Sequence, residues 1–273
     1  MKRIVNTKTL VVIFLIGLSV LLYPPVSSYY NSFHQSRAVS DYENAVAGLS
    51  EADYKEMIAS AQDYNQSLIG NSYRFEPDEQ EEAAYQSLLN PDGTGVMGYI
   101  EIPKIRVSIP VYHGTDDAVL SAGVGHIEGT SLPVGGTGTH CALSGHRGLP
   151  SSKLFTDLDQ LEIGDTFKIT VLNETLTYKV DQIKIVLPDD TSDLGIDPDQ
   201  DYVTLLTCTP YTINTHRLLV RGVRTEDENT STVTAEAVQI DPLIIAGILT
   251  VSVLILLMTV FIVQTSEKYM KHH

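Results

Sequence analysis

Positive charge is scarce in this sequence. Lysine and arginine together contribute 18 residues against 34 aspartates and glutamates, so the formal net charge is -16. A surface that binds nucleic acid needs a patch of basic residues to neutralise phosphates, and the chain carries no run that would supply one. The composition therefore argues against nucleic acid as a partner.

Cysteine is almost absent as well, and internal repeats are missing. Cys141 and Cys208 are the two cysteines in 273 residues. In an exported protein the default interpretation of such a pair is a disulfide bond. The alternative is that one of the two thiols is kept free for chemistry.

Long apolar runs are confined to the two ends. Residues 10–23 (LVVIFLIGLSVLLY) follow three basic residues, and no clear small-x-small cleavage site comes after them, which favours an uncleaved anchor over a signal peptide. Residues 242–263 form 22 positions without a charge, long enough to cross a bilayer, and Lys268 and Lys271 follow. The positive-inside rule then predicts two cytoplasmic termini and an extracellular segment over residues 25–240.

These features predict seven consecutive segments. They are a cytoplasmic N-terminus (1–9), an anchor or signal segment (10–23), a helical extension (24–95), a β-rich domain (96–225), a polar linker (226–241), a transmembrane helix (242–263) and a basic cytoplasmic tail (264–273).

Local patterns predict the elements between the apolar runs. Residues 36–68 favour one or two helices with Ser40 and Ser50 as N-caps, and residues 69–82 favour an irregular segment. From Val96 onward, short alternating runs predict seven or eight strands, with one helical insertion at 153–161. The strand sequences are GYIEIP, VSIPVY, HCALSGH, TFKITVL, LTYKVDQIKIVL, YVTLLTC and RLLVRGV. So many short strands are typical of a closed β-barrel or a sandwich.

The stretch YVTLLTCTPYTINTHRLLVRG, residues 202–222, ends one predicted strand at Cys208 and opens the next at Arg217. If the two strands form a hairpin, these residues lie opposite each other at its mouth. A thiol attacks a carbonyl as thiolate, which needs a basic or positive neighbour, and the resulting oxyanion needs a fixed donor. Arginine remains charged at any working pH and can supply that donor.

A general base must come from elsewhere in the chain. Three of the eight histidines lie near the membrane or on the tail (His34, His272 and His273), which leaves His113, His126, His140, His146 and His216. His146 ends a predicted strand and enters the Gly/Pro-rich loop RGLP, a setting that catalytic groups favour. Spacing alone ranks it only slightly above its rivals, among which His140 shares its strand face.

The segments GVGHIEGTSLPVGG, ALSGHRGLP, VLPDDTSDL and YVTLLTCTPYTINTHRLLVRG together resemble the sortases, and among them the class C, pilus-building group of Gram-positive bacteria. The resemblance covers residues 98–224 and the two membrane segments. It implies an all-β fold, a closed eight-stranded barrel with short helices. It also implies that Cys208 is the nucleophile, His146 the proton donor to the departing amine and Arg217 the oxyanion partner.

The resemblance implies a reaction and its partners. Cys208 would cleave the Thr-Gly bond of an LPxTG-like C-terminal sorting signal through a thioester, and a lysine amine of the next pilin would form an isopeptide bond. Thr207 and Leu206 are weaker candidates for substrate contact, and no cofactor or metal is implied. Two alternatives remain, a sortase that anchors single surface proteins to peptidoglycan and a non-catalytic membrane-anchored adhesin or assembly scaffold. A papain-like hydrolase fits less well, because that family places its cysteine early, at a helix start.

One family feature is missing. Class C sortases carry a lid with an Asp-Pro-aromatic motif before the barrel, and the nearest match here is the segment 73–78 (YRFEPD). The lid is therefore degenerate, displaced or missing, and we assign no lid contacts.

Alternation along HCALSGH bears on the two cysteines. Cys141 lies on the opposite strand face from His146, so if His146 points at Cys208, Cys141 points into the core as a small apolar residue. Alternation often fails near strand ends, so the disulfide stays as an alternative. The acidic run 189–201 could chelate calcium, although its spacing is irregular and aspartates commonly cap turns.

Overall fold

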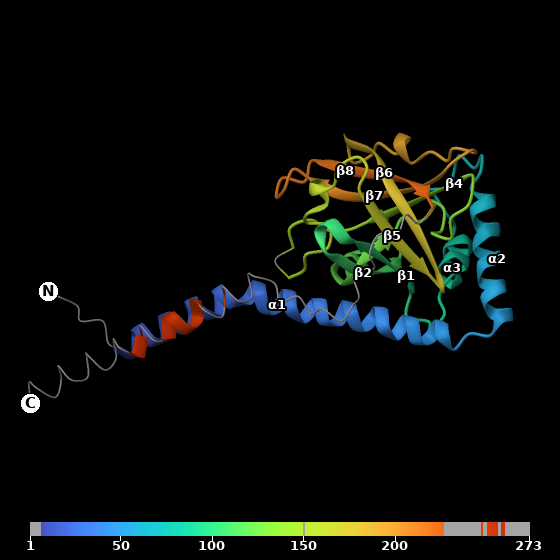
Figure 1. Ribbon diagram of the computed structural model, residues 1–273. Helices are drawn as coiled ribbons and strands as arrows, with labels where there is room; N and C mark the ends of the chain where they lie inside the picture. The colour runs from blue at the N-terminus through green and yellow to red at the C-terminus, as the bar shows by residue number, and fades with distance from the viewer. Residues whose placement is uncertain (1–6, 150, 227–246, 248–249, 256–257, 260–273) are drawn as a thin grey trace, which may run out of the picture. The chain divides into compact units, whose positions relative to one another are not determined.

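The structure is a computed structural model that describes residues 7–149, 151–226, 247, 250–255 and 258–259 (Figure 1). The chain divides into two compact units, Met1–Tyr30 with Thr232–His273, and Asn31–Ser231. The predicted segments 1–9, 226–241, 242–263 and 264–273 fall wholly or mostly outside the described residues.

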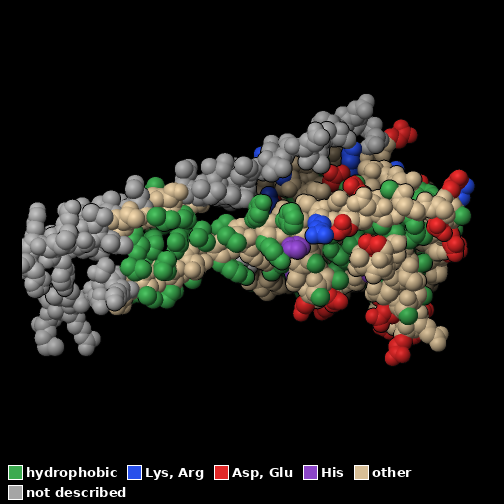
Figure 2. All heavy atoms as spheres, turned by 90° about the horizontal axis from the view of Figure 1, so that it is seen from below, with side chains coloured by type: hydrophobic (Ala, Val, Ile, Leu, Met, Phe, Trp, Pro, Cys, Tyr) green, Lys and Arg blue, Asp and Glu red, His purple; other side chains and the backbone are tan. Residues whose placement is uncertain are grey.

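The first unit contains the start of the long helix α1 (Thr7–Ala47). Its apolar side chains are exposed, among them Ile16 at 61% and Val20 at 70%, and Figure 2 shows them along the helix. The stretch Val11–Ala47 is, within the described part of the chain, the one helix long and apolar enough to cross a membrane. The helix continues through Pro24 and Pro25, where the sequence predicted a segment boundary.

Two further helices precede the barrel. Helix α2 (Glu51–Ser67) begins at Ser50, which caps it in a reciprocal pair with Asp53, so the predicted cap at Ser50 is confirmed. The predicted cap at Ser40 is wrong, because this residue lies inside α1. Helix α3 (Glu79–Ser87) starts within the segment expected to be irregular, because Asp78 accepts from the first free N–H groups of that helix.

Eight strands close into a barrel, as the all-β prediction required. Their bounds are β1 Val96–Ile102, β2 Val107–His113, β3 Val124–His126, β4 Thr139–Ser144, β5 Thr166–Val171, β6 Glu174–Val186, β7 Asp201–Thr209 and β8 His216–Thr225. The order around the barrel is β1-β2-β3-β4-β7-β8-β6-β5. Strand β7 therefore lies between β4, from which two strands separate it in the chain, and β8, which follows it directly.

Short helical elements connect the strands. Helix α4 (Asp117–Ala122) precedes β3, and the 3-10 helices η1 (Pro103–Ile105), η2 (Leu158–Gln160) and η3 (Ser192–Leu194) lie in loops. The helix predicted over 153–161 is wrong beyond the single turn of η2. Leu154 has φ of 35°, and a right-handed helix cannot contain that conformation.

The core fills the barrel interior with alternate residues of each strand. Ile100, Leu143, Phe167, Leu205 and Val220 are fully buried there. Burial of large apolar side chains of this kind is the main favourable contribution to folding.

Tyr42 on α1 fastens the helix to the barrel. It is fully buried, and its hydroxyl donates to Met97 O at 3.0 Å while accepting from Leu172 N at 2.6 Å. Because this phenol both donates and accepts, the C-terminal part of α1 is held on the barrel wall by polar contacts as well as by packing.

Candidate active site

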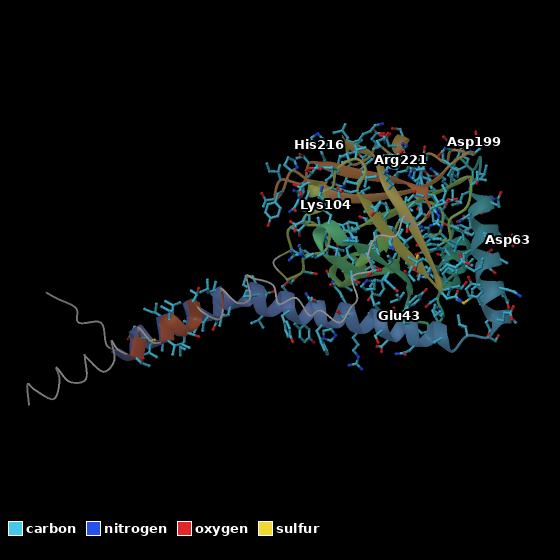
Figure 3. The ribbon with its side chains drawn as sticks, in the orientation of Figure 1. Glu43, Asp63, Lys104, Asp199, His216 and Arg221 are labelled. Atoms are coloured by element: carbon cyan, nitrogen blue, oxygen red, sulfur yellow. The ribbon has the colours of Figure 1, made fainter. Side chains whose placement is uncertain are left out.

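Cys208 lies near the end of β7 and pairs across the antiparallel ladder with Arg217 on β8. The connecting loop has six residues, because Thr209 and His216 also belong to the ladder. The hairpin predicted from spacing is thereby confirmed. Figure 3 labels His216 at one end of the barrel and Asp199 at the other, so the pair lies at the His216 end.

His146 enters the same end from the other side of β7. Strands β4 and β7 pair in parallel, with Ser144 opposite Leu206, and Gly145 N donates to Leu206 O at 3.0 Å beyond the last pair. Continuing this register by two residues aligns His146 with Cys208. Neighbouring strands are separated by about 4.8 Å, so aligned side chains on one face are neighbours.

Alternation along β7 separates two faces. Leu206 and Cys208 are half-buried on the outer face, whereas Thr207 and Thr209 are buried on the inner face at 1% and 7% exposure. The hydroxyl of Thr207 donates to Gly145 O at 2.7 Å, so this side chain has an internal partner and is not exposed to a substrate. Leu206 lies on the same face as the thiol.

The Arg217 guanidinium is positioned by its own hairpin. Its Nη1 donates to the carbonyl oxygens of His216 at 3.2 Å and Asn214 at 3.4 Å. An arginine has five N–H donors, and both contacts use those of Nη1. The guanidinium is half-buried, so its other donors can meet an oxygen that develops charge beside Cys208.

His140, the main rival on the same strand, has a structural environment. Its Nδ1 contacts Gly195 O and its Nε2 contacts Thr204 Oγ1, each at 2.8 Å, and its ring is 1% exposed. Burial lowers the pKa of His140 to about 4. Six strand positions separate it from His146, roughly 20 Å at 3.3 Å per residue.

His126 and His113 are likewise structural. His126 is fully buried between Tyr85 Oη at 2.8 Å and Ser131 O at 2.9 Å, and burial lowers its pKa to about 4. His113 contacts two backbone carbonyls, those of Gly95 and Leu88. Both rings hold the strands β2 and β3 to the segments around α3.

The two cysteines are not bonded to each other. Both thiols are free; Cys141 is 2% exposed in the core, and Cys208 is half-buried. Burial raises the pKa of the Cys141 thiol well above its ordinary value, which keeps it protonated and inert. The disulfide alternative is therefore wrong, and the alternation along β4 holds.

Comparison with known proteins places this geometry in a family. The family model of the sortase domain matches residues 100–225. The crystal structure of sortase C1 from Streptococcus agalactiae is 53% identical, with a TM-score of 0.68, and the match covers 70% of this chain and 100% of that chain. Sortase C from Clostridium perfringens, solved with a C-terminal cell wall sorting motif, is 44% identical with a TM-score of 0.62, covering 70% and 100%.

This chain belongs to the sortase family, class C. Sortases are cysteine transpeptidases. Among curated proteins, sortase D of Bacillus subtilis is 31% identical over 131 residues, which are 48% of this chain and 63% of that protein. The match thus spans less than two thirds of that relative's length.

The loop that follows His146 in this sortase is held by a hydrogen bond within the loop and by two from α1. His146 O accepts from Phe155 N at 3.1 Å, which closes the loop on itself. Two residues of α1 reach it, Asn31 Nδ2 donating to Ser151 O at 2.9 Å and Gln35 Nε2 to Ser152 Oγ at 3.1 Å. Helix α1, part of the predicted helical extension, therefore contacts the loop that follows His146, the candidate acid.

Arg147 is the residue at this site that sequence analysis missed. It forms an ion pair with Asp159, donates from Nη1 to Thr209 Oγ1 at 3.2 Å and lies 6.0 Å from the Tyr211 ring. The signal in the sequence that could have revealed it is alternation. Arg147 follows His146, and Thr209 follows Cys208, so alternation predicts that Arg147 and Thr209 share the side opposite to the candidate catalytic pair.

The lid candidate, segment 73–78, makes its contacts elsewhere. Arg74 Nη2 donates to Leu194 O at 2.9 Å, and Gly129 packs against Arg74 and Phe75. Leu194 adjoins Gly195, the partner of His140, at the end of β4 remote from Cys208. These contacts do not bring the segment over the thiol.

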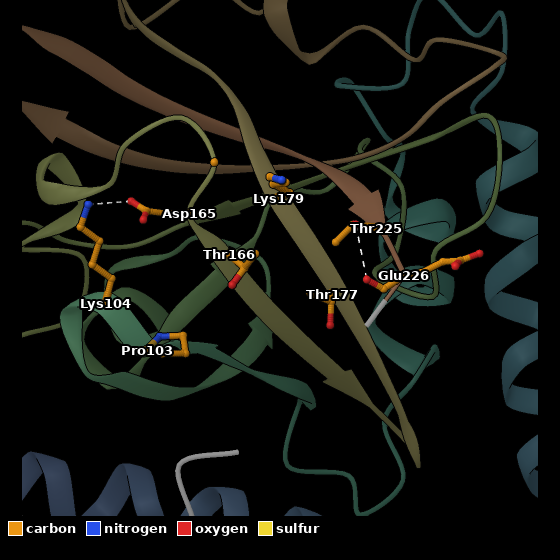
Figure 4. A pocket seen from close by; sticks show the side chains of 9 residues that line it. Pro103, Lys104, Asp165, Thr166, Thr177, Lys179, Thr225 and Glu226 are labelled. Atoms are coloured by element: carbon orange, nitrogen blue, oxygen red, sulfur yellow. Dashed lines mark hydrogen bonds and ion pairs between the residues drawn. The ribbon is translucent and has the colours of Figure 1, made fainter. Parts of the chain in front are cut away.

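Two other features lie apart from the site. In the acidic run, Asp190 and Asp197 cap turns and Asp193 pairs with Lys184 at 2.5 Å; within the residues that the structure describes, no group of three or more His, Cys, Asp or Glu could hold a metal. A surface pocket of about 280 Å³ is lined by residues including Lys104, which pairs with Asp165 (Figure 4).

Proposed function

We propose that this class C sortase joins pilin subunits, with Cys208 as nucleophile, His146 as acid and base and Arg217 as oxyanion partner. The observation that supports this most strongly is the strand order β4-β7-β8, in which Cys208 pairs with Arg217 and His146 follows the end of the neighbouring strand β4 by two residues. His113, His126 and His140 have internal ring contacts, and His216, which pairs with Thr209 beside Cys208, has its described ring contact with Thr215 on its own hairpin.

The chemistry follows from these placements. The Cys208 sulfur attacks the threonine carbonyl of an LPxTG-like signal, and Arg217 donates to the oxyanion. The C–N bond breaks, and His146 gives a proton to the departing glycine amine, leaving a thioester. A lysine amine of a second pilin attacks the thioester, loses its proton to His146 and expels the sulfur, so an isopeptide bond forms. The proton that His146 gives to the glycine amine is the one it took from the Cys208 thiol before the attack.

Exclusion of water decides the product, since hydrolysis of the thioester competes with transfer. The loop after His146 and the loop between β7 and β8 pack together beside the thiol, with the Tyr211 ring against Gly148. We propose that these two loops limit the access of water to the thioester.

We further propose that the catalytic domain is extracellular, with membrane segments at 10–23 and 242–263 and both termini in the cytoplasm. The apolar surface of the first segment supports this, as do the basic residues that flank the two runs. The topology can be tested by adding single cysteines at chosen positions and measuring which of them an impermeant thiol reagent labels on intact cells. Labelling at either terminus would contradict it.

Incubation of the full-length chain in detergent with a pilin that carries a sorting signal tests the function. Wild type should give SDS-resistant ladders and a transient thioester adduct visible by intact mass, and Cys208→Ala should give neither. Ladders that persist in Cys208→Ala would refute the assignment. Transfer to a peptidoglycan stem peptide in place of pilin lysine would support the anchoring alternative. Failure of a thiol-directed probe to label Cys208 would support the non-catalytic scaffold.

A further inference from the structure

Two contacts on the inner face bracket the candidate catalytic pair. Gly145 precedes His146 and accepts from Thr207, which precedes Cys208, at 2.7 Å. Arg147 follows His146 and donates to Thr209 Oγ1, the residue after Cys208, at 3.2 Å. The residues directly before and after both members of the pair are therefore tied to each other across β4 and β7.

The contact between Arg147 and Thr209 lies beyond the last backbone hydrogen bond between the β4 segment and β7. The β4–β7 ladder ends at Ser144 and Leu206, with one further backbone bond from Gly145 N. Beyond that point the described residues show no further backbone hydrogen bond from this loop to β7, and the bond from Phe155 N to His146 O stays within the loop. Arg147 is the side chain that reaches from this loop to the cysteine strand.

The surroundings of Arg147 fix its direction. Its side chain is 10% exposed, and Asp159 pairs with the same guanidinium from the following turn. The Nε atom is buried and, within the described residues, has no hydrogen-bond partner. The Asp159 side chain is 48% exposed, so solvent screens this ion pair and its contribution to stability is small. The burial of the Arg147 guanidinium therefore calls for another role.

We propose, on the basis of the proposed function, that Arg147 is a positioning residue that holds His146 in register with Cys208 through Thr209. The guanidinium contacts the buried Thr209, whereas His146 and Cys208 are both half-buried. Transfer of a proton between sulfur and imidazole is sensitive to shifts of about 1 Å, because misplacement on that scale can cost about 100-fold in rate. Arg147 therefore acts through His146 and touches no substrate.

The test compares Arg147→Met with the matched control Arg221→Met in the full-length chain. Arg221 also forms an ion pair with an aspartate, Asp181, and lies 4.0 Å from a tyrosine ring, that of Tyr202, but it contacts neither catalytic strand end. We expect Arg147→Met to lower kcat for sorting-signal cleavage by about 10- to 100-fold with KM changed less than twofold. Arg221→Met should change kcat less than twofold.

A second readout does not use a substrate. The rate of Cys208 alkylation by iodoacetamide at pH 7, followed by peptide mass, reports how well His146 activates the thiol. We expect a fall of about 5-fold or more in Arg147→Met and none in Arg221→Met. If cleavage is absent in wild type while alkylation follows this pattern, the proposed function fails and the positioning role stands.

Substitutions at Thr209 test the same contact from its other partner, in case Arg147→Met does not fold. Thr209→Val removes the acceptor at nearly constant shape, and Thr209→Ser restores it. We expect loss in the first, recovery in the second, and no added loss when Thr209→Val is combined with Arg147→Met. Unchanged kcat in both Arg147→Met and Thr209→Val would overturn the proposal. A rise in KM alone would instead make Arg147 a substrate contact, and equal losses in Arg147→Met and Arg221→Met would reduce the effect to stability.

Discussion

The ring of Tyr211 lies against the backbone of Gly148, so closely that a Cβ atom at residue 148 would come within 2.6 Å of the ring. This contact joins the loop after His146 to the loop after Cys208. Gly148 also has φ of 78°, a left-handed conformation that favours glycine. The backbone conformation thus favours glycine at this position, and a side chain there must displace the half-exposed Tyr211 ring.

Gly148→Ala should displace Tyr211 and separate the two loops. We expect a loss of about 2–4 kcal/mol in the free energy of unfolding and at least a 10-fold lower kcat. The control is Gly93→Ala, because Gly93 has φ of 76° with nothing within 4 Å of an added Cβ. The control should lose about 1–2 kcal/mol and retain its kcat. Urea unfolding and steady-state cleavage measure both; equal behaviour of the two variants would show that packing on Tyr211 does not matter.

Replacing Arg217 tests its part in the reaction. Arg217→Met removes the proposed oxyanion donor, so kcat should fall by about 100- to 1,000-fold with little change in KM. Arg224→Met on the same strand should leave kcat within about twofold. A variant that loses only substrate affinity would assign Arg217 to binding.

The two strand-β4 histidines should separate function from stability. His146→Ala should abolish turnover while leaving the domain folded. His140→Ala should lower the melting temperature, because Gly195 O and Thr204 Oγ1 lose their partner, yet retain most turnover at 25 °C. Turnover assays and thermal melts on both variants decide this, and the reverse pattern would transfer the acid role to His140.

The free energy of unfolding should fall as the pH is lowered, because two buried histidines resist protonation in the folded state. Burial lowers the pKa of His126 and His140 to about 4, so the unfolded chain takes up their protons at a higher pH than the folded one. Their contribution is complete above about pH 6.5 and is lost as the pH falls towards 4, by about 1.4 kcal/mol per pH unit for each ring. His140→Gln should flatten this slope by one ring's share in urea titrations between pH 4.5 and 7.5. Parallel slopes in wild type and variant would contradict the burial effect.

Tyr42→Phe tests the attachment of α1 to the barrel. It leaves Met97 O and Leu172 N without their partner in a buried site, so we expect a loss of about 1–3 kcal/mol in the free energy of unfolding. Tyr54→Phe is the control, because the Tyr54 hydroxyl meets Glu174 at an exposed position and should contribute less than about 1 kcal/mol. Similar losses in the two variants would show that burial of the Tyr42 contact has no special effect.

Much of the barrel could be predicted because its strands alternate. Seven strands appear as apolar and polar runs, and the ladder between Cys208 and Arg217 follows from the length of one hairpin. Strand β3 has three residues, too few for a periodic signal. The helix predicted at 153–161 failed because local composition does not reveal the positive φ of Leu154.

The candidate site was harder to predict than the barrel. His146 could be ranked only slightly above four other histidines, because its alignment with Cys208 depends on parallel pairing between segments separated by two intervening strands. The contact from Arg147 to Thr209 depends on the same pairing. Sequence spacing records neighbours along one chain segment, and this pairing arises only when the barrel closes.

Strand order also has a consequence for biosynthesis. The strand that carries Cys208 pairs on one side with β4, which is synthesised early, and on the other with β8, the last strand of the barrel to leave the ribosome. A nascent chain that ends before Arg217 carries a thiol beside an open sheet edge, with no guanidinium next to it. Under the proposed roles, an unfinished chain lacks the oxyanion partner, so its transfer of substrate should be slower by about 100- to 1,000-fold, as expected for loss of Arg217.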